Sequence, residues 1–492
     1  MRDVAVVGAG PAGLAAAVEA AEAGLGVTLI DTAAQPGGQY WRHYDQTHAR
    51  PDDHLGHHGW SVFTRLRARL DALRTAGRIH YLPGHQVWLI TREPSGPFTL
   101  RVTAATADNR PAGPGRTLTA QALILCPGGY DRQLPVPGWD LPGVMTAGGA
   151  QALLKGHRTP AGKRAVVAGT GPFLLPVATG LARAGVTVAA VVEANGTLGW
   201  LRSPAGAASA PGKSVEALRY AALMARHHIP YRTRTVVREV LGTDRAEAVR
   251  VARVDREGRP TGPDEEIAAD LVAFGWGFTP SLELPLMLGA RTATDTDGSL
   301  VVAVDDRQRS SVDGLYVAGE ATGVGGAALA VNEGRLGALA LAAERGRLAD
   351  PALMSRLGAA VRRGRRFAAA MHRTYPLPRA WPEWLTDSTL VCRCEEVAYG
   401  DLRRAHHDLG AEDARTLKML ARPGMGWCQG RVCGLATAGI AAWLSGRETG
   451  VDDLRPLATR SLAVPVPLGE LAALVEETTP PEAAEEGGRN GD

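Results

Sequence analysis

The sequence predicts an α/β protein in which two strand–loop–helix–strand units are nested, followed by a small helical domain. Residues 4–31 contain a short apolar run, a glycine loop, a small-residue helix and a second apolar run that ends on an acid. Residues 164–193 repeat this pattern, and a later strand and helix at 314–335 complete the first unit. Four of the five cysteines lie beyond both units, between positions 392 and 433. These observations indicate two nested Rossmann-like dinucleotide-binding domains and a separate C-terminal module.

The first glycine loop, Gly8-x-Gly10-x-x-Gly13, follows a strand whose apolar run predicts burial on both faces. Gly8 allows a tight turn, Gly10 lets the backbone approach a pyrophosphate, and Gly13 lets the helix pack close to the strand. The phosphates would sit at the helix N-terminus, where unpaired N–H groups and the helix dipole favour an anion. Asp31, at the end of the second strand, can accept hydrogen bonds from a ribose. We therefore predict a dinucleotide site here.

Two further loops extend this site. Gly38 and Gln39 follow Asp31, and a flexible glycine beside an amide suits close passage of the backbone past a ring system. Gly128 follows a buried strand at 123–125, where small residues let the backbone pass close to a nucleotide. We assign to the same site, as further cofactor-binding residues, Pro11, Ala12 and Val87.

The second unit departs from the pattern at one position. Gly169 and Gly171 follow an apolar strand and Glu193 ends the next one, but Leu174 takes the place of the third glycine. A leucine there should push the helix away from the strand, so this site is expected to be widened, repurposed or empty. Glu193 disfavours NADP, because an acid would repel its 2′-phosphate. Two alternatives stay open: a working NAD(H) site built on Gly169, Gly171 and Glu193, and a retained but idle domain.

The run GLYVAGEATGVGGAALAVNEGR at 314–335 returns the chain to the first unit as a buried strand, an acid, a glycine loop and a long helix. Together with the two nested units, this run resembles the two-dinucleotide-binding-domain flavoproteins over about residues 1–345. The resemblance implies FAD, held by Gly8, Gly10, Gly13, Asp31, Gln39, Gly319 and Glu320. Glu320 stands where the family usually has aspartate, and it is placed to hydrogen-bond a ribityl chain. Another adenine nucleotide remains the alternative ligand.

The clustered cysteines predict a metal centre. Cys392-x-Cys394 and Cys428-x4-Cys433 provide four thiolates, enough for one [2Fe–2S] cluster, and neighbouring glycines can direct N–H groups at the sulfurs. Zinc is the alternative, but zinc modules more often use C-x2-C pairs, so the spacing favours iron–sulfur. Cys126 stands alone, and because the sequence has no C-x-x-C pair, a dithiol reductase is not expected.

The run VCRCEEV at 391–397, with GMGWCQGRVC at 424–433, resembles the bacterioferritin-associated-ferredoxin-like [2Fe–2S] domain. Its fusion to a flavoprotein resembles the large subunits of hydrogen cyanide synthase, opine oxidases and dye-linked proline or hydroxyproline dehydrogenases. This resemblance implies an oxidoreductase that passes electrons through FAD and the cluster. It also implies a smaller FAD-dependent amine-oxidase-type partner that holds an amine or amino-acid substrate. No catalytic residue is assignable, and a self-contained NAD(P)H-dependent flavin/iron–sulfur reductase is the alternative.

Composition narrows the classes of partner. Lys and Arg number 54 against 51 Asp and Glu, a balance that does not indicate nucleic acid as a partner. No uninterrupted apolar run reaches the ~20 residues that a membrane-spanning helix needs. We expect a soluble cytoplasmic chain, with a peripheral component of a respiratory chain as one candidate electron acceptor.

The motifs divide the chain into successive segments. They are an FAD-binding part at 1–150, an inserted NAD(P)-binding-like domain at 151–270, the second FAD-binding part at 271–345, a linker at 346–386, the [2Fe–2S] domain at 387–450, an extended segment at 451–477 and a disordered tail at 478–492.

Overall fold

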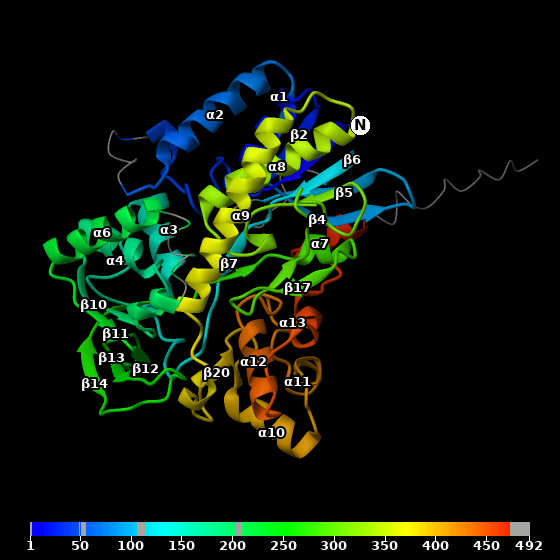
Figure 1. Ribbon diagram of the computed structural model, residues 1–492. Coiled ribbons are helices and arrows are strands. Elements are labelled where there is room, and N and C mark those ends of the chain that lie inside the picture. The colour runs from blue at the N-terminus through cyan, green and yellow to red at the C-terminus, as the bar shows by residue number, and fades with distance from the viewer. Residues whose placement is uncertain are drawn as a thin grey trace, which may run out of the picture.

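The computed structural model describes residues 2–48, 50, 56–105, 115–202, 204, 206, 209 and 211–472. Its first sheet has the strand order β3-β2-β1-β6-β5-β4, with β19 paired to β6 (Figure 1). Strands β1, β2, β3, β6 and β19 are parallel, whereas β4, β5 and β6 form an antiparallel meander. The strands are β1 (Arg2–Val7), β2 (Val27–Asp31), β3 (Ile79–Pro83), β4 (His85–Arg92), β5 (Phe98–Ala104), β6 (Arg116–Leu125) and β19 (Leu315–Val317).

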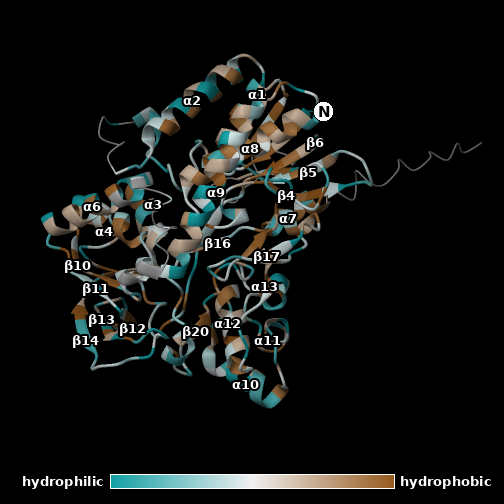
Figure 2. Cartoon of the chain, viewed as in Figure 1, coloured by the Kyte–Doolittle hydropathy of each residue, from teal (hydrophilic) through white to brown (hydrophobic). Residues whose placement is uncertain are grey.

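Small residues let two helices of the first unit pack very closely. Helix α1 (Pro11–Glu22) contacts α8 (Ala327–Glu344), and a Cβ added at Gly334 would lie 2.0 Å from the Ala12 carbonyl oxygen. α1 begins at proline, which suits the first helical turn because an N–H group there would have no acceptor within the helix. Amphipathic α2 (Trp60–Thr75) buries Phe63, Leu66 and Leu70. Figure 2 shows the apolar strands of this sheet in brown and the polar α10 at the far end of the molecule in teal.

The second unit repeats the parallel arrangement in the order β11-β10-β9-β15-β8. Its elements are β8 (Val144–Thr146), α3 (Ala147–His157), β9 (Arg164–Gly169), α4 (Leu174–Arg183), β10 (Thr187–Glu193), α6 (Pro211–Arg226), β11 (Tyr231–Thr233) and β15 (Leu271–Gly275). β15 lies beside β9 as β6 lies beside β1. β8, before the expected limit at 150, and β15, after the expected limit at 270, both belong to this sheet.

Shorter strands and one short helix lie outside the two main sheets. A three-stranded sheet, β12-β13-β14, follows β11, and β16 pairs with β7 where the chain passes between the two units. Their bounds are β7 (Gly129–Asp131), β12 (Thr235–Leu241), β13 (Ala248–Arg253), β14 (Glu265–Ala268), β16 (Phe278–Pro280), α7 (Glu283–Met287), β17 (Thr292–Thr294) and β18 (Leu300–Val302).

The segment expected as a linker contains the 24-residue helix α9 (Pro351–Thr374), which packs on α8. Arg365 on this helix faces inward rather than solvent. It donates a hydrogen bond to Gly323 O at 2.7 Å and forms an ion pair with the fully buried Glu333. A buried carboxylate needs such a partner, since an unpaired charge away from water is costly.

The C-terminal module is helical, as expected, and lies below β17 in Figure 1. A short ladder, β20 (Leu390–Cys392) with β21 (Val397–Ala398), leads into α10 (Tyr399–Leu409), α11 (Ala414–Ala421), α12 (Gly434–Leu444) and α13 (Val451–Ala458). Helix α13 replaces the extended conformation expected from residue 451. It forms because Asp453 accepts a hydrogen bond from Gly450 N at 2.9 Å and Leu454 and Leu457 are buried.

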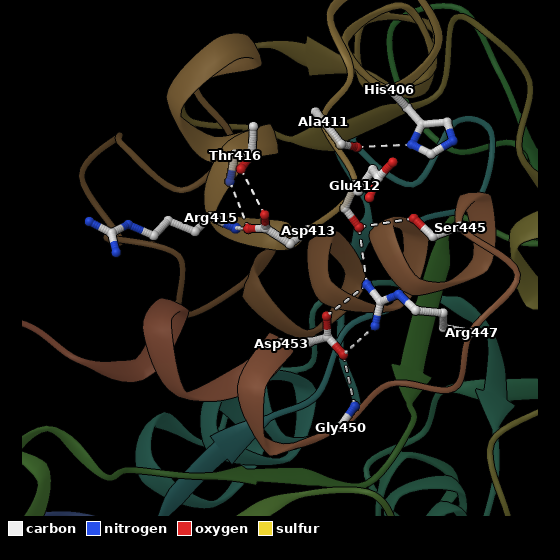
Figure 3. A network of polar contacts seen from close by, with 10 residues as sticks. All are labelled: His406, Ala411, Glu412, Asp413, Arg415, Thr416, Ser445, Arg447, Gly450 and Asp453. Carbon is white, nitrogen blue, oxygen red and sulfur yellow. Dashed lines mark hydrogen bonds and ion pairs between the residues drawn. The ribbon is translucent and has the colours of Figure 1, made fainter.

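A polar network fastens these helices together (Figure 3). Arg447 forms an ion pair with the buried Asp453 at 3.2 Å and donates a hydrogen bond to Glu412 O at 3.0 Å. Asp413 caps α11 by accepting hydrogen bonds from Arg415 N and Thr416 N. The network joins the loop before α11 to the turn between α12 and α13.

Within the described part of the chain, no helix is both long and apolar enough to cross a lipid bilayer. The expected tail at 478–492 lies outside the described residues.

Candidate functional site

A cavity of about 1150 Å³ opens where the parallel strands of the first sheet end. Gly8 follows β1, Asp31 ends β2, Cys126 follows β6 and Ala318 follows β19, and all four residues line it. Ligands of open α/β sheets bind outside the carboxyl ends of the strands. The volume exceeds the ~300–1,000 Å³ of pockets for drug-sized ligands, so the cavity has room for a dinucleotide.

Most of the residues assigned to the first site line this cavity. They are Gly8, Gly10, Pro11, Ala12, Asp31, Gly38, Gln39, Gly128, Gly319 and Glu320. Gly13 and Val87 are not among the lining residues. Gly13 lies where α1 meets the loop, and Val87 is 5% exposed and packs in the hydrophobic core from β4.

The three glycines of the loop meet different demands. Gly8 has φ +98°, and an added Cβ would lie 2.2 Å from Cys126 O; at Gly13 it would lie 1.8 Å from Gly8 O. The fold itself therefore requires both. At Gly10 the backbone is extended, and the nearest atom to an added Cβ is Gly38 Cα at 3.9 Å. Nothing among the described residues requires a glycine at position 10, whereas a phosphate close to the backbone would.

Carboxyl groups stand at two places along the cavity. Asp31 accepts hydrogen bonds from Ala9 N and, at 2.7 Å, from Ala33 N, and burial raises its pKa. Each carboxylate oxygen has two acceptor positions, so capacity for a ribose hydroxyl remains. Glu320 has no side-chain hydrogen bond within the described residues, and burial, with a smaller contribution from nearby Asp131, raises its pKa to about 7. A half-buried carboxyl that lines a cavity and has no hydrogen-bond partner in the described part of the chain fits a ligand hydroxyl, which the ribityl chain of FAD would offer.

Sequence reasoning missed the far wall of the cavity. Asp131 and Lys155 line it, as do Phe173 and Phe278, whose ring centroids lie 5.1 Å apart. Burial lowers the pKa of Lys155 to about 8. Asp131, Lys155 and Phe278 are not part of any glycine loop, and Phe173 is a variable position of the second one, so only the packing of the second unit against the first identifies these side chains.

The second glycine loop differs from the first in geometry. α1 begins directly after Gly10, with Leu14 N bonded to Gly10 O at 2.9 Å. In the second unit α4 begins only at Leu174, after turn-type hydrogen bonds from Leu174 N to Gly171 O and from Leu175 N to Pro172 O. Leu174 is fully buried, and its Cδ2 would lie 2.8 Å from a Cβ added at Gly275 in β15. The leucine thus fills the region between helix and strand, whereas Gly13 lets α1 approach the first loop too closely for any side chain.

Glu193, the acid of the second unit, is already engaged by its own chain. It accepts hydrogen bonds from the Thr170 hydroxyl at 2.9 Å, Gly171 N at 2.8 Å and Asn195 N at 2.9 Å, and it is fully buried. Burial raises its pKa to about 7. The carboxylate turns into the glycine loop rather than toward a ribose.

The four C-terminal cysteines come together as two close pairs. Cys392 accepts a hydrogen bond from Gly424 N at 3.4 Å and one from the Cys433 thiol, which lowers the pKa of Cys392 to about 5. Cys394 and Cys428 lie within hydrogen-bonding range of each other. The pairs also interact electrostatically, Cys394 with Cys392 and Cys433 with Cys428. Cys126 is separate, because it is buried in the core of the first unit after β6.

Among the described residues, no group of three or more His, Cys, Asp or Glu side chains could hold a single metal ion. A [2Fe–2S] cluster takes two thiolates on each iron, so three residues need not converge on one ion. Two neighbouring thiol pairs with a backbone N–H directed at one sulfur suit this donor set.

The fold and the cavity define an FAD-dependent oxidoreductase with two dinucleotide-binding units. The chain belongs to the pyridine nucleotide-disulphide oxidoreductase family, whose model matches residues 2–337.

Relatives match over nearly the whole length. One subunit of the opine oxidase of Rhizobium meliloti is 32% identical, with 96% of this chain and 87% of that protein covered. The HcnB subunit of the hydrogen cyanide synthase of Pseudomonas aeruginosa is 31% identical, with 96% and 98% covered. The crystal structure of L-proline dehydrogenase from P. horikoshii superposes with a TM-score of 0.68 at 20% identity over 96% of this chain and 79% of that one. That structure supports the fold over the C-terminal module as well as the two units.

Proposed function

We propose that this chain is the electron-transferring large subunit of a heteromeric dehydrogenase or oxidase for amino acids, imino acids or opines. The observation that carries the proposal is the presence, in one chain, of a dinucleotide cavity and a centre of four paired cysteines. Two relatives at 31–32% identity are named as subunits, one of an opine oxidase and one of hydrogen cyanide synthase. Such names support the existence of a partner subunit, and in this proposal the partner holds the substrate.

The proposed cofactors are FAD in the cavity and one [2Fe–2S] cluster on Cys392, Cys394, Cys428 and Cys433. FAD would supply two-electron redox chemistry and the cluster one-electron transfer. The chain's own residues would do the binding: Gly10 admits the pyrophosphate, Asp31 holds a ribose and Glu320 holds the ribityl chain. In this proposal the strands and helices from Leu390 to Ala458 form the cluster domain.

Co-expression tests the proposal. The chain is expressed alone and with the products of its neighbouring genes, and amino acids, imino acids and opines are assayed with an artificial dye acceptor. We expect turnover only with a smaller flavoprotein subunit, because the described residues form no recognisable substrate site for an amino acid. Full turnover by the chain alone would contradict the proposal.

A second candidate, an NAD(P)H-dependent reductase, predicts fast flavin reduction by NADH. We expect slow reduction at micromolar NADH, because Leu174 fills the space beside β15 and Glu193 is bonded to its own loop. Stopped-flow absorbance at the flavin band measures the rate. The variant Leu174→Gly tests the steric reason and should increase the rate if the leucine is the obstacle. Rapid reduction of the unmodified chain would favour the reductase.

A further inference from the structure

A buried ion cluster joins the first unit to the cysteine module. Glu283, the first residue of α7, is 6% exposed. Its Oε1 atom forms an ion pair with Arg431 Nε at 2.9 Å and accepts a hydrogen bond from Arg460 Nη1 at 3.0 Å. Both arginines belong to the C-terminal part of the chain, one between two predicted cluster ligands and the other just after α13.

The same two arginines hold the loop that carries the second cysteine pair. Arg460 donates two hydrogen bonds to Gln429 O, at 2.6 and 3.0 Å, and Arg431 donates one to Cys428 O at 3.2 Å. Gln429 has φ +52°, a left-handed conformation that is uncommon for a residue other than glycine. Such a conformation persists where its surroundings over-determine it, and the two guanidinium groups supply that constraint.

The charges of the ion cluster also act on one residue of the dinucleotide cavity. Tyr130, on β7, lines this cavity. Burial raises the pKa of Tyr130, and Glu283 raises it further, while Arg460 and Arg431 lower it; the Cys428 thiol also lies within electrostatic range. The same charges therefore act on a residue of the cavity wall and bind the backbone beside a proposed cluster ligand.

We propose that Glu283 is a positioning residue that fixes the Cys428–Cys433 loop to helix α7 through Arg431 and Arg460 and, with these two arginines, sets the potential of the iron–sulfur cluster. This inference rests on the proposed function, since it requires the cluster. One carboxylate and two guanidinium groups carry a net charge of +1. Removal of the carboxylate raises the net charge beside the iron–sulfur cluster to +2, which favours the reduced form of the cluster. Removal of one arginine lowers the net charge to 0, which favours the oxidised form.

The experiment compares Glu283→Gln with Arg460→Gln in the full chain, purified anaerobically. Iron content, the midpoint potential from an EPR-monitored titration and amide hydrogen exchange of residues 428–431 are measured. Both variants should speed exchange in this loop about a hundredfold, because each breaks a buried ion pair. The potentials should move in opposite directions, upward for Glu283→Gln and downward for Arg460→Gln. The control is Glu265→Gln, whose ion pair with Arg232 is exposed and remote from the cysteines; it should change none of these quantities.

The outcomes separate the inference from the proposed function. Zinc in place of iron, or the absence of iron, in the unmodified chain would overturn the proposed function. Amide hydrogen exchange of residues 428–431 would then still test whether Glu283 positions the loop. A fully loaded Glu283→Gln variant with unchanged exchange and potential would overturn the inference alone. If the midpoint potential shifted in the same direction in both variants, Glu283 would be a structural contact only, and this result would also overturn the inference.

Discussion

Replacement of Cys428 by serine is expected to abolish the iron–sulfur cluster. Cys428 lies beside Cys394 and interacts with Cys433, so its loss leaves one iron with an incomplete set of thiolates. The anaerobically purified unmodified chain should contain about two irons and two acid-labile sulfides, with little zinc. The Cys428→Ser variant should contain almost no iron or labile sulfide. The visible absorbance of the cluster and the EPR signal of its reduced form should disappear.

The matched control is Cys126→Ser. Cys126 is buried behind the glycine loop of the first unit, and burial raises the pKa of its thiol, so it is a poor metal ligand at neutral pH. Its replacement should leave the iron content unchanged. Stoichiometric zinc without labile sulfide in the unmodified protein would contradict the iron–sulfur assignment, and loss of iron from Cys126→Ser would contradict the assignment of ligands.

Local patterns predicted the parts of the fold that depend on neighbours in sequence. The two nested Rossmann-like units are confirmed, because a strand, a glycine loop and a helix within ~30 residues define each one. The four C-terminal cysteines also come together, but each close pair joins one cysteine from each motif, Cys392 with Cys433 and Cys394 with Cys428, so the pairing depends on tertiary packing. The helix α13 was missed, because proline inside a short polar segment obscured a helix that Asp453 and two buried leucines stabilise.

The remaining features of the site depend on contacts between distant segments. Glu193 has the sequence position of a ribose-binding acid, yet it accepts hydrogen bonds from Thr170 and Asn195. The sequence pattern does not show whether such an acid binds a ribose or its own loop. The ion cluster of Glu283 with Arg431 and Arg460 joins segments far apart in the sequence, so only tertiary packing brings it together. Arginine and glutamate are mostly exposed in folded proteins, so their sequence positions alone do not indicate a buried ion cluster.

Gly10→Ala is expected to remove the FAD from the protein while leaving the protein folded. An added methyl group meets only Gly38 Cα, at 3.9 Å, and the extended backbone at Gly10 suits alanine. The substitution should therefore stabilise the cofactor-free chain slightly, by about 0.4–1 kcal/mol, through the lower entropy of its unfolded state. In the holoprotein the methyl would stand where the pyrophosphate approaches the backbone, so affinity should fall at least about a hundredfold, or ~2.7 kcal/mol. Cofactor released by denaturation, identified by chromatography, measures the loss, and thermal unfolding of the cofactor-free protein measures the stability.

Two variants make this result specific to the cavity. Gly358 lies within helix α9, and a Cβ added there would meet only a flexible arginine at 3.5 Å. Gly358→Ala should therefore stabilise the helix by about 1 kcal/mol and leave the FAD content unchanged. Gly8→Ala should impair folding itself, because φ is +98° and the new Cβ lies 2.2 Å from a backbone oxygen. Full FAD content in Gly10→Ala would contradict the placement of the pyrophosphate. Release of an adenine nucleotide without flavin from the unmodified chain would show that flavin chemistry belongs to the partner subunit.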